Sequence, residues 1–207
     1  MTDPVRLGTP HDVTSPPVLL LASGSPRRRA LLDGAGIRFE IQRPDIVEER
    51  APGEAPEALA RRLADAKAAA VAQRVGPVPR RWVLAADTIV VLADQVLGKP
   101  QDPEHAVELL GQLVGRTHRV LTAVTLLDSA AGTPHRTLVE STVRMRGATR
   151  AEIVRYIATG ESLDKAGAYA LQGAGRRFVT TVEGSESNVI GLPLEQTLAL
   201  LKAAGAT

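Results

Sequence analysis

The sequence predicts an α/β fold built on a mixed β-sheet. Short apolar segments alternate with segments of helical length, which is typical of α/β proteins. Two later apolar segments are joined by one short loop, which indicates an antiparallel pair within the same sheet. The chain has 207 residues, of which 44% are hydrophobic and only 2% aromatic, so we expect one large domain with an aliphatic core.

The first predicted elements surround a turn of small residues. Residues 1–17 contain four prolines and no apolar period, so we expect a disordered tail, with the domain in residues 18–207. The apolar run 18–22 predicts a buried strand. Pro26 then begins a helix that has Ser25 as its N-cap and ends at Gly34 and Gly36. A second strand is expected over residues 37–42.

Further along, the pattern predicts a long helix over residues 56–75. Its expected buried stripe consists of Leu59, Leu63, Ala66 and Ala70. An apolar strand follows over residues 82–93, and Asp102 is expected to cap a helix that begins at Pro103 and ends near Gly115.

The last part of the chain combines the expected hairpin with two more helices. The two strands of the hairpin are predicted over residues 118–128 and 137–145. Thr149 and Glu152 form the pattern of a capping box for a helix that ends at Gly160. Residues 161–186 are glycine-rich and predict a loop with one or two strands, and a final helix is expected over residues 193–204.

Composition and charge exclude several classes of function. The chain has no cysteine, which excludes disulfides and thiol catalysis and favours a reducing compartment, so we expect a cytoplasmic location. No apolar run reaches the roughly 18–20 residues of a membrane span. The formal net charge of +2 and the scarce aromatic residues argue against binding to nucleic acid.

The turn between the first strand and the first helix is a candidate anion site. Backbone N–H groups at a helix N-terminus favour an anion, and Ser23 lies in the small-residue turn that precedes it. Arg27, Arg28 and Arg29 in the first turn oppose the helix dipole, which an anion bound between them would explain. The alternative is an ordinary capped helix with solvated arginines.

Asp87 is a candidate for catalysis or metal binding. It lies in the middle of an apolar strand, where a carboxylate is costly to bury unless it is paired or binds a cation. Carboxylate oxygens suit Mg²⁺ or Mn²⁺, and beside such a cation Asp87 could ligate metal or activate water. The alternative places Asp87 at a strand end, where it caps a turn or pairs with an arginine. Its neighbour Thr88 is expected on the opposite face of the strand.

Other polar residues could serve a phosphate or a base. Lys67 lies near the buried stripe of the long helix, and Lys99 follows the Asp87 strand, although each alone is better explained as a solvated surface residue. Lys165 and Gln172 lie among small residues in the glycine-rich segment, and the Gln172 amide could contact a base edge. The alternative is a structural loop without contact to a ligand. His118 and Asn188 are interpreted as structural.

Four motifs, in order along the chain, resemble the Maf family of nucleoside triphosphate pyrophosphatases. They are Leu21-Ala-Ser-Gly-Ser-Pro-Arg-Arg28, Ala86-Asp-Thr88 with Leu97-Gly-Lys-Pro100, Asp164-Lys-Ala-Gly-Ala-Tyr169 with Gln172-Gly173, and Asn188-Val-Ile-Gly-Leu-Pro193. The resemblance implies an elongated mixed sheet in two lobes with a central cleft, similar to inosine triphosphate pyrophosphatases. It also implies hydrolysis between the α and β phosphates, a divalent metal ion (Mg²⁺ or Mn²⁺) and a possible homodimer.

The resemblance also implies roles for individual residues. Asp87 matches the family's proposed general base, and Glu48 matches an acidic residue of the site, so both are expected to bind the metal. The residues that match substrate-binding positions are Ser23, Arg27, Arg28, Lys67 and Lys99. Arg27, Thr88 and Gln172 stand at the specificity positions of the subgroup that prefers dTTP and UTP.

Two hypotheses follow from the sequence. The first is a metal-dependent hydrolase of surplus or modified pyrimidine nucleotides. The second is a nucleotide-binding regulator of cell division with little catalysis. Asp87 favours the hydrolase, because a carboxylate that faces phosphates repels them unless a cation lies between.

Overall fold

The computed structural model describes residues 18–207, and the expected tail at residues 1–17 lies outside them. The described chain forms a mixed seven-stranded sheet flanked by helices, which confirms the predicted class. The strands are β1 (Val18–Ala22), β2 (Glu40–Ile41), β3 (Arg81–Leu92), β4 (Gln95–Leu97), β5 (Thr117–Asp128), β6 (Pro134–Met145) and β7 (Val179–Glu183). The helices are α1 (Pro26–Gly34), α2 (Pro56–Val75), α3 (Pro103–Leu113), α4 (Arg150–Ile157), α5 (Glu186–Ile190) and α6 (Leu194–Ala203), with 3₁₀ turns η1 (Ala166–Ala168) and η2 (Ala174–Phe178).

The sheet has parallel and antiparallel parts. Its strand order is β2-β1-β3-β5-β6-β7, with β4 paired to β3. Strand β1 is parallel to both β2 and β3, whereas the remaining pairs are antiparallel. Ala22 at the end of β1 pairs with Ala85, so β3 continues past that end through Asp87 and Thr88. The turn after β1 therefore lies beside the middle of β3. Ligands of α/β sheets commonly bind at the carboxyl end of a parallel strand such as β1.

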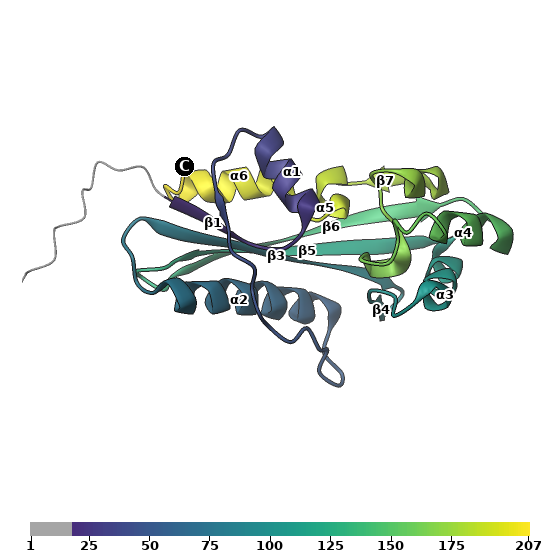
Figure 1. Ribbon diagram of the computed structural model, residues 1–207, viewed down its shortest axis with the longest axis horizontal. Coiled ribbons are helices and arrows are strands. Elements are labelled where there is room, and N and C mark those ends of the chain that lie inside the picture. Colours follow the sequence, from purple (N-terminus) through teal and green to yellow (C-terminus); the bar gives the residue numbers. More distant parts are fainter. Residues whose placement is uncertain (1–17) are drawn as a thin grey trace, which may run out of the picture.

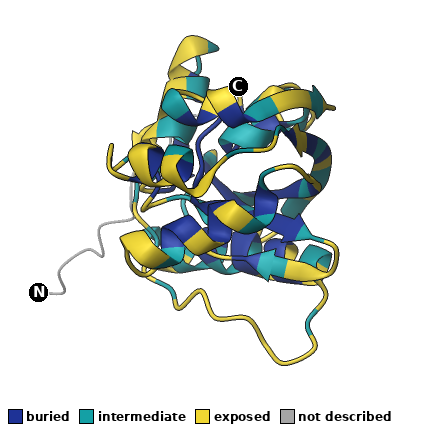
Figure 2. Cartoon of the chain, turned by 90° about the vertical axis from the view of Figure 1, so that its right-hand side faces the viewer, coloured by how far each residue is buried: buried dark blue, intermediate teal, exposed yellow. Residues whose placement is uncertain are grey.

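Helices cover both faces of the sheet. Figure 1 shows α2 along one face, α1 and α6 along the other, and α3 with α4 gathered at the far end of the long strands. The apolar core divides accordingly into clusters under α2, a cluster between β1 and α6, and a large cluster around α3, α4 and Phe178. Figure 2 shows buried residues where the helices face the sheet and exposed residues on their outer sides. The molecule is thus elongated, with separate cores toward its two ends.

The predicted helix starts are confirmed in detail. The Ser25 hydroxyl accepts a hydrogen bond from the Arg28 N–H, and the Asp102 carboxylate accepts one from the His105 N–H. Thr149 and Glu152 form the reciprocal capping box. These caps satisfy N–H groups that a helix cannot satisfy itself, which explains why the starts could be located from sequence.

Several predicted elements differ in the structure. The strand expected over residues 37–42 is reduced to Glu40–Ile41, because the Ile37 N–H bonds to the Leu32 carbonyl and closes the end of α1. On α2, Leu59 and Leu63 are buried as expected, but Ala66 and Ala70 are only half-buried. The other buried residues of α2 are Ala60, Ala64, Lys67, Ala68 and Val71, and the three alanines allow a close approach to the sheet. Strand β4 and helix α5 were not predicted as separate elements.

None of the helices between Val18 and Thr207 combines the length and the apolar character needed to cross a membrane.

Candidate active site

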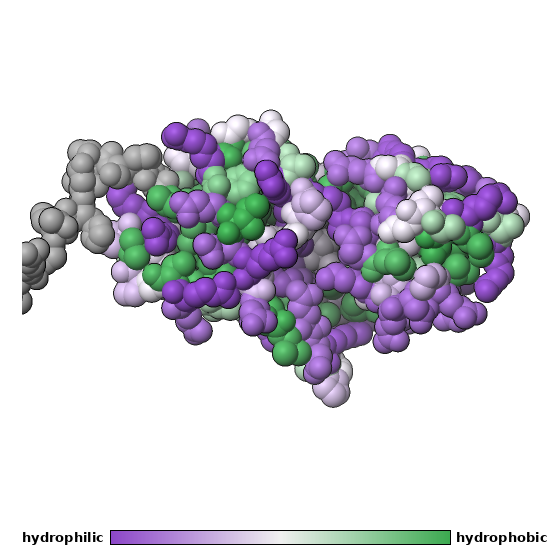
Figure 3. All heavy atoms as spheres, in the orientation of Figure 1, coloured by the Kyte–Doolittle hydropathy of each residue, from purple (hydrophilic) through white to green (hydrophobic). Residues whose placement is uncertain are grey.

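A cavity of about 810 Å³ lies between the two ends of the molecule. Figure 3 shows this face hollowed at that place, with hydrophilic side chains around the hollow. All ten candidate site residues line the cavity: Ser23, Arg27, Arg28, Glu48, Lys67, Asp87, Thr88, Lys99, Lys165 and Gln172. They come from α1, α2, β3 and four of the segments that connect the helices and strands, so the fold brings distant parts of the sequence to one place.

The cavity concentrates positive charge. Seven lysines and arginines line it, against only three acidic residues. The whole chain, by comparison, has a formal net charge of +2. A walled cavity with one sign of charge raises the local concentration of the opposite ion, so this cavity favours an anionic ligand.

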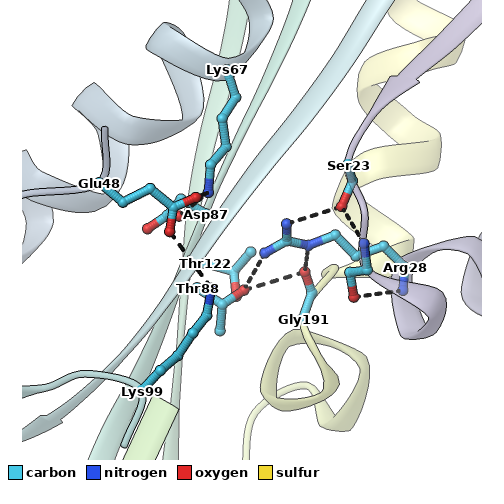
Figure 4. Close-up of polar contacts among 10 residues, drawn as sticks. Ser23, Arg28, Glu48, Lys67, Asp87, Thr88, Lys99, Thr122 and Gly191 are labelled. Carbon is cyan, nitrogen blue, oxygen red and sulfur yellow. Dashed lines mark hydrogen bonds and ion pairs between the residues drawn. The ribbon is translucent and has the colours of Figure 1, made fainter. Parts of the chain in front are cut away.

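Arg28 is held in place by three neighbours, two of which come from distant segments (Figure 4). Its Nε donates to the Gly191 carbonyl at 2.7 Å, and its two terminal nitrogens donate to Ser23 Oγ at 3.4 Å and Thr88 Oγ1 at 3.1 Å. Burial lowers the pKa of Arg28, and the nearby Asp87 carboxylate partly offsets this effect. A guanidinium has five N–H donors, so two of them stay available to a ligand.

Residues of β5 and β6 hold the partners of Arg28 in place. Thr88 Oγ1 lies 3.0 Å from Thr122 Oγ1, and Thr122 donates to the Asn188 carbonyl at 3.1 Å. The Asn188 amide in turn donates to the Val120 carbonyl and to Ser141 Oγ, both at 3.0 Å. Asn188 is fully buried, which confirms its structural interpretation: it secures α5 and hence the Gly191 carbonyl.

On the other face of β3, Lys67 bridges two carboxylates (Figure 4). Its Nζ lies 2.6 Å from Asp87 Oδ1 and 2.7 Å from Glu48 Oε1. Lys67 and Asp87 are buried, whereas the Glu48 side chain is 41% exposed and also lies 3.7 Å from the exposed Lys99. Burial raises the pKa of Glu48, but the hydrogen bond and charge of Lys67 outweigh that effect and leave the pKa below its ordinary value.

These contacts decide between the alternative interpretations that the sequence left open for Asp87 and for Lys67. Asp87 is buried in mid-strand and pairs with a lysine, not at a strand end with an arginine. Lys67 is buried at the site and is not a solvated surface residue. Thr88 contacts the Gly191 carbonyl that follows α5, and Asp87 contacts Lys67 of α2, so the two side chains lie on opposite faces of β3 as strand alternation predicts.

The donor chemistry of Glu48 and Asp87 fits a divalent cation. Both carboxylates converge on one ammonium group, so they face a common point beside the cavity. Within residues 18–207, no group of three or more His, Asp or Glu side chains forms a complete protein cage. Mg²⁺ is typically held by one or two carboxylates together with phosphate and water oxygens, and this pair matches that pattern.

The glycine-rich segment forms the other wall of the cavity. Lys165 is largely buried and pairs with Asp164, while the Gln172 side chain is exposed toward the opening. Arg27 faces this wall from α1, and its buried Nε has no partner within the described chain. Burial lowers the pKa of Arg27, and the charge of Asp164 partly restores it. Arg29, in contrast, points to solvent and pairs with Asp33, so it takes no part in the cavity.

Sequence reasoning missed two arginines of the cavity. Arg43 and Arg50 line it from the loop after β2, and the Arg43 side chain lies close to Gly24. The parallel pairing of β1 and β2 brings Ser23 and Arg43 to the same edge of the sheet. The signal that could have located Arg43 is therefore its position at the carboxyl end of a parallel strand.

His118 is structural, as interpreted from the sequence. It is buried, and its Nε2 lies 2.8 Å from the Tyr169 hydroxyl. Burial lowers its pKa to about 4. The ring is therefore neutral near pH 7 and supports the wall of the cavity from behind.

Comparison with known proteins gives consistent matches. The model of the Maf-like protein family matches residues 18–204. A dTTP/UTP pyrophosphatase of Myxococcus xanthus is 52% identical over 188 residues, which cover 91% of this chain and 93% of that protein. A dTTP/UTP pyrophosphatase of Syntrophotalea carbinolica is 44% identical over 206 residues, which cover 100% of this chain and 91% of that protein.

Among solved structures, a nucleoside-triphosphatase described as a dITP/XTP pyrophosphatase from Mycobacterium abscessus matches with a TM-score of 0.46 and 16% identity. The match covers 90% of this chain and 95% of that one. At this score and identity the similarity carries no argument about activity.

Proposed function

This chain belongs to the Maf-like protein family, and we propose that it is a nucleoside triphosphate pyrophosphatase with dTTP and UTP as preferred substrates. It splits the bond between the α and β phosphates and releases a nucleoside monophosphate and pyrophosphate. Such a reaction removes surplus or modified pyrimidine nucleotides from the nucleotide pool. The location in the cytoplasm, the homodimer and the division into tail and domain stay predictions.

The observation that carries the proposal is the concentration of positive charge around one buried carboxylate. Seven basic residues line a cavity that a triphosphate can enter, and Asp87 lies in its wall. Preorganised cations and N–H donors stabilise the charge that develops in phosphoryl transfer. A cavity for a neutral ligand would not require this excess of charge.

The turn between β1 and α1 is suited to bind the phosphates. Ser23 Oγ accepts from the Ser25 N–H at 3.1 Å, which shapes the turn in front of the helix N-terminus. Arg28 is already oriented by Ser23, Thr88 and Gly191, so little side-chain entropy is lost when its remaining N–H groups contact a phosphate. Lys99 reaches the same space from the loop after β4 and adds an exposed positive charge.

Asp87 is the group we assign to water activation. It faces the cavity from β3, and Lys67 holds one of its oxygens, which leaves the other free to orient a water molecule or to accept its proton. Glu48 shares Lys67 and, with Asp87, would hold the divalent cation. That cation supplies neutralisation of phosphate charge and a polarised phosphoryl group.

The nucleoside is assigned to the wall opposite Asp87. Arg27 and Gln172 border this part of the cavity with unused polar groups, whereas Thr88 fixes Arg28. An amide that both donates and accepts can pair with the edge of a uracil or thymine base. The preference for dTTP and UTP rests on these residues and on the names of the two relatives.

The experiment that tests the function is pyrophosphate release from a nucleotide panel. We expect release from dTTP and UTP in Mg²⁺ or Mn²⁺, little from GTP, ITP, CTP or 7-methyl-GTP, and none with a chelator. Asp87→Asn should lower kcat by about 10²-fold or more while the fold persists, as expected for loss of a general base. The matched control is Asp94→Asn, an exposed position in the turn after β3 that does not line the cavity.

Normal turnover of folded Asp87→Asn would refute the role of Asp87. Metal-dependent nucleotide binding without any pyrophosphate release by the wild-type protein would refute the hydrolase and favour the regulator of cell division.

A further inference from the structure

The segment that carries Gln172 is wrapped around a single carboxylate. Glu161 accepts hydrogen bonds from the N–H of Ala174 at 2.8 Å and of Gly175 at 3.0 Å, immediately after Gln172 and Gly173. Burial raises the pKa of Glu161, but these N–H donors outweigh it, so the pKa lies below its ordinary value and the group is ionised near pH 7. Charge-assisted bonds of this kind are among the stronger hydrogen bonds in proteins.

Tyr156 extends this support to the residues before Gln172. Its hydroxyl donates to Glu161 Oε1 at 3.0 Å and accepts from the Ala170 N–H at 3.1 Å. The Tyr156 ring is fully buried and packs edge-on against Phe178, with ring centroids 5.3 Å apart. Glu161 and Tyr156 therefore secure the backbone on both sides of Gln172.

The backbone fits so closely here that only glycine is accommodated at two positions. A Cβ on Gly173, where φ is +102°, would collide with the Glu161 carboxylate. A Cβ on Gly175 would lie 2.8 Å from the Tyr156 hydroxyl and would collide with the Ala170 carbonyl. The loop thus has one conformation that keeps both the carboxylate and the phenol in contact.

Neither support residue touches the cavity. Tyr156 and Glu161 lie behind the loop, whereas Ala170, Leu171 and Gln172 are among the residues of the described chain that line it. Their hydrogen bonds to this segment are made with the backbone N–H groups of Ala170, Ala174 and Gly175, so the loop connects them to a bound nucleotide.

A fixed loop has a chemical consequence for base recognition. The uracil edge presents an N3–H donor beside the O4 acceptor, and the cytosine edge presents an N3 acceptor beside the N4 amino donor. A glutamine amide has one acceptor end and one donor end, so a freely rotating Gln172 could satisfy either base. To discriminate between uracil and cytosine, the Gln172 amide must meet the base in one fixed orientation.

We propose that Glu161 and Tyr156 are positioning residues that set selectivity between uracil and cytosine nucleotides by fixing the loop that presents Gln172. The inference rests on the proposed function. It goes beyond that function because it assigns base selectivity to two residues outside the cavity.

The test uses Tyr156→Phe and Glu161→Gln, with Glu195→Gln on the exposed face of α6 as the matched control. Tyr156→Phe keeps the buried ring but leaves the Ala170 N–H without its acceptor. Glu161→Gln keeps the shape of the side chain but turns an NH₂ group toward a backbone N–H donor. We expect each variant to raise KM for UTP about tenfold, equivalent to about 1.4 kcal/mol, with kcat within about twofold and KM for CTP little changed.

A double-mutant cycle separates positioning from general destabilisation. In a Gln172→Ala background, Glu161→Gln should change the UTP-to-CTP ratio of kcat/KM by less than about twofold, because residues that act through one another are not additive. Equal changes for UTP and CTP, or effects that multiply in the double variant, would overturn the inference.

The same comparison can be made without catalysis. Calorimetric affinities of UMP and CMP report base selectivity directly, even for a protein that releases no pyrophosphate. Failure of the proposed function would appear as absent turnover in the wild type. Failure of this inference would appear as an unchanged UMP-to-CMP affinity ratio in Tyr156→Phe and Glu161→Gln.

Discussion

Lys67→Met should destabilise the fold far more than Asp87→Asn, although the two residues form one ion pair. Methionine preserves most of the length of the buried lysine stem but removes the ammonium group. That change leaves Asp87, only 5% exposed, and Glu48 as two neighbouring carboxylates without their shared counter-ion. Asp87→Asn, in contrast, leaves Lys67 paired with Glu48 at 2.7 Å.

The magnitudes follow from what each variant leaves buried. Removing one partner of a buried pair costs about 3–5 kcal/mol, because the other charge stays without compensation. Since the site opens into a cavity, we expect the lower end, about 3 kcal/mol, for Lys67→Met. Asp87→Asn exchanges one charged hydrogen bond for a neutral one and should cost about 1 kcal/mol. In the double variant Lys67→Met/Asp87→Asn the buried charge is gone, so it should be more stable than Lys67→Met by about 1–2 kcal/mol.

The assay is urea unfolding of the three variants and the wild type at pH 7 and low salt, with stability compared at equal m-values. Two results would refute the reasoning. One is equal destabilisation by Lys67→Met and Asp87→Asn, and the other is a double variant less stable than Lys67→Met alone.

Three further predictions concern other parts of the molecule. Burial lowers the pKa of His118 to about 4 in the folded protein, below the ordinary 6.5 of the unfolded chain. The contribution of the neutral ring to the free energy of unfolding is therefore complete above pH 6.5, and about 3 kcal/mol of it is lost as the pH falls toward 4. Urea unfolding at pH 7 and pH 4 should show a smaller acid loss in His118→Gln than in the wild type; equal losses would contradict the buried neutral ring. Thr88→Val removes the hydroxyl that joins Arg28 to Thr122 and should raise KM for every triphosphate while lowering stability by about 1–2 kcal/mol; unchanged KM values would contradict the role of Thr88 in orienting Arg28. Arg29→Ala breaks only an exposed pair and should change stability by less than about 1 kcal/mol and leave turnover unchanged, which steady-state kinetics can check.

The fold was most predictable where a local signal acts alone. Ser25, Asp102 and the Thr149 capping box mark helix starts because side-chain caps act within a few residues. Short elements were missed for the opposite reason. Strand β4 has three residues and depends on its pairing with β3, and β2 is short because Ile37 closes α1, which no local pattern reveals.

The site was predictable as a set of residues but not as a network. Placement in an apolar strand identified Asp87, the turn before α1 identified Ser23, Arg27 and Arg28, and the resemblance added the role of Glu48. The sequence does not indicate that Lys67 would be shared by Asp87 and Glu48, because that contact joins segments 20 residues apart through helix packing. Glu161 and Tyr156 were missed because their partners are backbone N–H groups, which carry no signature in the sequence.

The most direct test of the central claim is the identity of the products from dTTP. Phosphorus NMR of a reaction with the wild-type protein and Mg²⁺ should show dTMP and pyrophosphate forming in equal amounts, with no dTDP. Formation of dTDP and orthophosphate would contradict cleavage between the α and β phosphates. It would require a different placement of the triphosphate relative to Asp87.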